Sequence, residues 1–188
     1  MIKINYEKRW DNVKSSLGER DAFVVALPGN TRYLANSESP PGTPPSSTMN
    51  YVVIPKKSEP FAITSSLEEH RCRHESSVKD IRCWTTYPDI KSDGKSALEI
   101  LKSSLKEIKA KQIFTDTKVS LGRSFKVSVS SNVNELRSIK SKAELQRIKK
   151  AIKQSDAGQM FAHNLVESGE GLSEKEVRSE IDYFMARK

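Results

Sequence analysis

The chain has 188 residues, of which 36% are hydrophobic and 30% charged, so it fits one soluble domain of ordinary size plus a small appendage. No segment approaches the ~18 uninterrupted apolar residues that a membrane helix needs, and the opening stretch MIKINYEKRWDNVK lacks the apolar centre of a signal peptide. We therefore expect a cytoplasmic protein without a membrane partner. Two cysteines, Cys72 and Cys83, are too few for a disulfide scaffold, and the sequence leaves open whether they pair.

Positive charge is concentrated in one short segment. The net charge is +8, and residues 137–153 alone contribute +6, from seven lysines and arginines against Glu144. Such a run could bind phosphates. However, it contains no aromatic residue for base stacking and no nucleic-acid-binding motif, while its apolar residues follow helical spacing. We therefore interpret the lysines as the solvated face of a helix, and we do not expect nucleic acid as a partner.

The first fifty residues predict a helix, a buried strand and a long loop. Apolar residues at helical spacing indicate a helix over 6–17, and the continuous run AFVVAL at 22–27 is typical of a strand buried on both faces. Pro28, Gly29 and Asn30 then predict a sharp turn. Residues 35–50 hold four prolines, which exclude a helix and a central strand. We expect a functional loop there, at the rim of an active site, or else a tolerated surface insertion.

The middle of the chain alternates between strand and helix patterns. A hairpin is expected from strands at 51–55 and 61–64, followed by a short helix at 66–73. Further elements are a strand at 81–85, an amphipathic helix over 95–110 and a strand at 112–115. This order predicts an α/β fold, with a mixed β-sheet flanked by helices.

The last third contains helix signals without strand signals. Ser141 with Glu144, and Ser173 with Glu176, both match the capping box that begins a helix. Apolar residues continue at helical spacing after each box, and glycines separate the two segments. We therefore predict two C-terminal helices, which by themselves bury little surface and are typical of the start of a larger domain.

From this point the sequence resembles the creatinase/prolidase/aminopeptidase P family of Xaa-Pro peptidases. The segment 136–188 is similar to the linker and first two helices of the family's catalytic domain, with Arg137, Lys140, Ser141 and Glu144 matching the first part and Gly171, Ser173 and Glu174 the second. Asp21 to Val25 and Asn30 to Leu34 resemble the family's amino-terminal domain. The chain departs from the family pattern at Ala35-Asn36, where the family usually has Thr-Gly.

The resemblance implies a division of the chain at residues 1–135 and 136–188. The first part would be a creatinase-type amino-terminal domain, which in the family restricts entry to short proline-containing peptides and contributes to a homodimer. Substrate gating would fall to Asn30, Arg32 and Tyr33. The intact protein would hydrolyse the Xaa-Pro bond with two divalent metals, manganese, cobalt or zinc. The family's metal ligands (two Asp, one His and two Glu) lie downstream of the part matched here, so we expect this chain alone to be inactive and to hold no cofactor.

Other candidate sites have weaker support. His70, Cys72 and His74 could bind a metal, but Cys72 falls off the face that the two histidines would share on a helix. Asp80, Asp89, Asp93 and Asp116 show no paired spacing and are expected to cap turns. The alternative to a peptidase region is a non-enzymatic binding module of the same fold, holding a peptide, a protein or nucleic acid.

Overall fold

The computed structural model describes residues 3–36, 50–168 and 171–187 and divides the chain into two compact units. One unit spans Asn5–Ile139, and the other combines the residues before Asn5 with those from Lys140 onward. The sequence places the division slightly earlier, after residue 135. The predicted loop over 35–50 lies largely outside the described residues, so its role stays a prediction.

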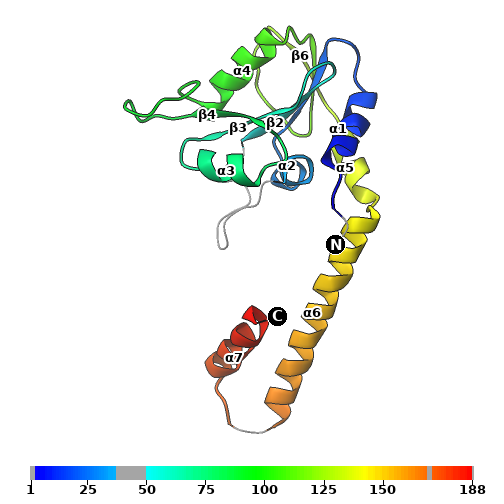
Figure 1. Cartoon of the computed structure of the whole chain (residues 1–188), viewed down its shortest axis with the longest axis vertical. Coiled ribbons are helices and arrows are strands. Elements are labelled where there is room, and N and C mark those ends of the chain that lie inside the picture. Colours follow the sequence, from blue (N-terminus) through cyan, green and yellow to red (C-terminus); the bar gives the residue numbers. More distant parts are fainter. Residues whose placement is uncertain (1–2, 37–49, 169–170, 188) are drawn as a thin grey trace. The chain divides into compact units, whose positions relative to one another are not determined.

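The first unit is a six-stranded mixed sheet with helices on both faces (Figure 1). The strand order is β4-β3-β2-β1-β5-β6, and only β2 runs against the others. The predicted α/β class and mixed sheet are confirmed. The strands are β1 (Asp21–Val25), β2 (Tyr51–Pro55), β3 (Phe61–Ser65), β4 (Asp80–Trp84), β5 (Gln112–Thr115) and β6 (Lys126–Val129).

Strand β1 explains why the sheet is covered on both sides. Phe23 and Val25 belong to one buried apolar cluster, and Ala22 and Val24 to the other, because successive side chains of a strand point to opposite faces. The continuous apolar run in the sequence therefore corresponds to a central strand, as predicted.

Four helices supply the apolar cluster on one face of the sheet, and a single longer helix covers the other. On the first face lie α1 (Tyr6–Ser15), α2 (Pro28–Ala35), α3 (Glu69–Glu75) and α5 (Asn132–Ser138). On the second lies α4 (Ala97–Glu107), which buries Ile100, Leu101 and Leu105. The Trp10 indole donates to the Leu34 carbonyl at 2.8 Å, which fastens α1 to α2.

Two sequence predictions were wrong in this unit, and two elements were missed. Residues 28–30 begin helix α2 rather than a turn, because proline fits the first helical position, where its missing N–H has no partner to lose. Helix α3 starts at Glu69 rather than Ser66, since a turn precedes it. Strand β6 and helix α5 were not predicted, since their serine-rich, half-exposed residues carry little apolar signal.

The second unit is the predicted helical pair, α6 (Lys142–Glu167) and α7 (Glu174–Ala186). Both capping boxes are formed, with Ser141 and Glu144 at the first helix and Ser173 and Glu176 at the second. The pair is held by stacked rings of Phe161 and Phe184, whose centroids lie 4.4 Å apart. No helix among the described residues is long and apolar enough to cross a membrane.

We expect Phe184→Ala to release α7 from α6. A 13-residue helix is marginal in water without packing, so losing the ring should leave α7 largely unprotected in amide hydrogen exchange. Tyr183→Ala is the matched control, because the neighbouring Tyr183 is 61% exposed and its loss should leave protection nearly unchanged. Equal loss of protection in both variants would contradict this account of the pair.

Candidate functional site

Ligands of α/β sheets usually lie outside the carboxyl ends of the strands, and here that edge carries a polar network. Asp116 directly follows β5, and its carboxylate accepts hydrogen bonds from the backbone N–H groups of Ala26 at 2.9 Å and Leu27 at 3.1 Å. These two residues precede α2. The carboxylate thus fixes the backbone that leads into α2, and its negative charge is favoured beside the positive end of the helix.

Asn30 extends this network inside the first turn of α2. Its side chain is fully buried and donates to Asp116 at 2.9 Å and to the Asn134 side-chain oxygen at 3.0 Å. The Arg137 guanidinium donates to the Asn30 oxygen at 2.7 Å and lies against Gly29, where a Cβ atom would approach it to 3.0 Å. Residues from β5, α2 and α5 are therefore joined through one buried amide.

The three residues predicted to gate substrate lie on different sides of α2. Asn30 points into the network, whereas Arg32 is exposed. The Tyr33 ring is half-buried beneath the Arg9 guanidinium, 3.9 Å from the ring centroid, and the Tyr33 carbonyl accepts a hydrogen bond from Arg9. Arg32 and Tyr33 thus present a positive charge and an aromatic ring just before residues 37–49, while Asn30 is engaged inside the fold.

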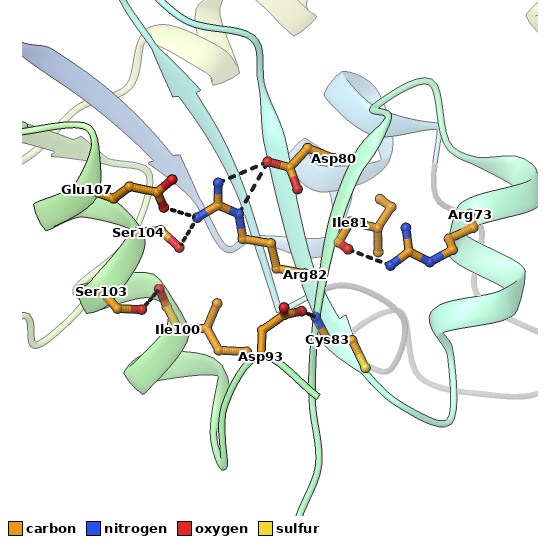
Figure 2. A network of polar contacts seen from close by, with 10 residues as sticks. All are labelled: Arg73, Asp80, Ile81, Arg82, Cys83, Asp93, Ile100, Ser103, Ser104 and Glu107. Carbon is orange, nitrogen blue, oxygen red and sulfur yellow. Dashed lines mark hydrogen bonds and ion pairs between the residues drawn. The ribbon is translucent and has the colours of Figure 1, made fainter. Parts of the chain in front are cut away.

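The other aspartates are also engaged in the fold or exposed. Figure 2 shows Arg82 of β4 bonded to Asp80 at 3.0 Å, to Glu107 at 2.8 Å and to Ser104 at 2.7 Å. Its guanidinium also lies 4.2 Å from the Phe61 ring centroid. The ion pairs and hydrogen bonds of Arg82 fasten α4 to the sheet and line a shallow polar pocket. Asp93 accepts from the Cys83 N–H at 2.7 Å, and Asp89 is exposed. Asp93 and Asp116 thus accept from backbone N–H groups 10 and 90 positions away, rather than from the nearby turn that the sequence led us to expect.

The potential metal ligands do not converge. Cys72 is buried and contacts Thr64, whereas His70 and His74 are exposed. Asp116 has both oxygens bonded to N–H groups, and Asp80 is paired with Arg82. Within the described ranges, no cluster of three or more His, Cys, Asp or Glu residues could hold a metal ion. These residues do not fit a two-metal hydrolytic centre.

Both cysteines are free and buried. Burial raises the pKa of the Cys83 thiol to about 12, and its hydrogen bond with the Glu69 carboxylate contributes to the shift. The thiolate is the reactive form, so Cys83 is a packing residue rather than a nucleophile.

Solved structures establish what this fold is. No known family model matches the sequence, and no curated protein matches it significantly. The Xaa-Pro dipeptidase from Bacillus anthracis matches 97% of this chain with 49% of its own, at 18% identity and a TM-score of 0.70. The prolidase from Pyrococcus horikoshii OT3 matches 96% of this chain with 48% of its own, at 18% identity and a TM-score of 0.67. The X-Pro aminopeptidase from Thermotoga maritima MSB8 matches 93% of this chain with 49% of its own, at 19% identity and a TM-score of 0.68.

The class defined by these likenesses is an α/β domain followed by two helices. The chain has the fold of the prolidase amino-terminal domain together with the helices that follow it, which confirms the resemblance read from the sequence. It spans about half the length of these three solved structures.

We predict that Asp116→Ala destabilises the first unit by about 3 kcal/mol, because it leaves buried N–H groups without an acceptor. The free energy of unfolding, from denaturant titration, measures the loss. Asp89→Ala is the control, since an exposed carboxylate should change stability by less than about 0.5 kcal/mol. Similar small losses in the two variants would mean that the network contributes little.

Cys83 should make stability depend on alkaline pH. Because its pKa is raised in the folded state, the unfolded chain ionises first, and stability falls as pH rises from about 9 to about 12. The slope contributed by one such group is at most about 1.4 kcal/mol per pH unit. Unfolding titrations of wild type and Cys83→Ala across this range should therefore converge with rising pH. Parallel curves would show that the thiol ionises normally.

Proposed function

We propose that this chain is the amino-terminal, substrate-gating and dimerisation region of a cytoplasmic Xaa-Pro metallopeptidase of the creatinase/prolidase class. The intact protein would hydrolyse the bond between an N-terminal residue and proline. Supporting this proposal are the fold, the coverage of about half of the three Xaa-Pro peptidases named above, and the motif residues around both capping boxes.

The observation that carries the proposal is an uncovered apolar stripe on α6. Leu145, Ile148 and Ile152 lie at helical spacing and are 45%, 42% and 53% exposed. No residue of α7 is fully buried either. Apolar side chains in a regular stripe are normally covered by another element, and a catalytic half that follows these helices would supply it.

Substrate gating in this proposal belongs to Arg32 and Tyr33. Both lie on α2, which precedes the proline-rich segment in the sequence, and the positive charge of Arg32 would attract a peptide carboxylate. Asn30 would act indirectly, by holding α2 at the carboxyl edge of the sheet through Asp116. Two divalent metals, manganese, cobalt or zinc, would be held by downstream residues and would activate water and polarise the scissile carbonyl.

The chain alone should not hydrolyse Xaa-Pro dipeptides or tripeptides in the presence of manganese, cobalt or zinc. The expected result is no release of proline above the metal-only control, because the described residues provide no metal centre. Turnover that co-purifies with the chain and disappears with a chelator would overturn this assignment. A coding frame continuing past Lys188 with two Asp, one His and two Glu at the family's spacing would support it directly.

The alternative is a binding module that uses the basic helix. Its test is a salt-dependent shift of labelled DNA that is lost in Lys149→Glu/Lys150→Glu.

The same lysine variant is the control for a test of the exposed apolar stripe on α6. Ile148→Glu/Ile152→Glu should lower the fluorescence of a hydrophobic dye, whereas the lysine variant should leave it unchanged.

A further inference from the structure

The two edges of the sheet differ in how the outward backbone groups of their strands are hydrogen-bonded. On β4, most of the backbone groups that point away from β3 already have partners: Asp93 bonds to both the N–H and the carbonyl of Cys83, and Arg73 donates to the Ile81 carbonyl at 2.9 Å (Figure 2). The Thr85 N–H donates to the Gly94 carbonyl at 3.1 Å. This edge is closed against another strand.

Strand β6 forms the opposite edge, and its register with β5 shows which groups face outward. The N–H groups of Lys126 and Ser130 donate to β5, so alternate residues of β6 are bonded inward. The backbone groups of Val127 and Val129 therefore point away from the sheet. Among the described residues, no hydrogen bond covers these groups, in contrast to β4. Val129 is also 60% exposed.

We propose that β6 pairs antiparallel with β6 of a second copy of this chain, with the two-fold axis at Ser128. In that register Val127 of each copy exchanges backbone hydrogen bonds with Val129 of the other, so all the outward groups of both strands are used. The inference deepens the dimer proposed above, but it does not depend on peptidase activity.

The strand is self-complementary in this register. Lys126 would lie opposite the partner's Ser130, so no like charges meet. The β-branched pair of Val127 and the partner's Val129 is one that antiparallel strands favour, and it would cover the exposed Val129 side chain. Ser128 would face its own copy at a position without backbone bonds, where side chains lie closest. An unrelated extended peptide would match the backbone groups but not this symmetry.

The short length of β6 limits the expected affinity of the dimer. It has four residues, and an interface of this size falls in the range of weak, transient complexes. We expect a dissociation constant on the order of 100 µM for the isolated chain. Additional contacts in an intact protein would strengthen it.

A charge swap at Ser128 tests the pairing and its register together. Ser128→Lys and Ser128→Glu each place like charges opposite one another and should weaken self-association at least tenfold in sedimentation equilibrium, while an equimolar mixture should recover it. Both variants lose the same Gln112 hydrogen bond, so they control for each other, and circular dichroism confirms that each is folded. A wild-type chain that is monomeric up to about 1 mM, a dimer that neither variant weakens, or a mixture that does not recover would overturn the proposal.

Cross-linking provides a second, independent readout. Ser128→Cys should form a disulfide-linked dimer under mild oxidation, since Cα atoms at such a position lie close enough for a disulfide. The natural cysteines are buried and contribute little background. Ser92→Cys, in the exposed segment near the closed edge, is the matched control and should remain monomeric. Equal dimer formation by the two variants would contradict pairing through β6.

Discussion

The carboxylate of Asp116 holds together the part of the molecule on which its candidate site depends. It lies at the end of a central parallel strand and bonds to the backbone at the start of α2 and to the buried Asn30 amide. Arg137 closes the network from α5. Buried polar groups stabilise a unique arrangement only when all are satisfied. Here the result is a helix fixed at the carboxyl edge of the sheet, and this helix carries Arg32 and Tyr33.

Several acidic and thiol groups of the first unit are engaged within the fold. Asp116 and Asp93 bond to backbone N–H groups, Asp80 pairs with Arg82, and Cys83 is held as a thiol. The exposed stripe on α6 is the observation on which the proposed peptidase assignment rests.

The sheet edges add a constraint on assembly. Open strand edges attract other strands, and proteins usually block them. This chain blocks one edge with Asp93 and Arg73 and leaves β6 open, in a segment whose sequence is compatible with pairing to itself. A dimer formed there would extend the sheet without involving the carboxyl-edge network.

The sequence by itself determined the elements with strong local signals. The apolar run of β1, the hairpin of β2 and β3, the stripe of α4 and both capping boxes depend on neighbouring residues, and all were predicted correctly. The resemblance of 136–188 to Xaa-Pro peptidases likewise came from short motifs. Tertiary structure decided what depends on distant partners. Helix α2 is fixed in place by a carboxylate 86 positions from Asn30, and β6 is a strand because β5 lies beside it. No local pattern encodes such contacts, since residues far apart in the sequence meet only after the chain has folded.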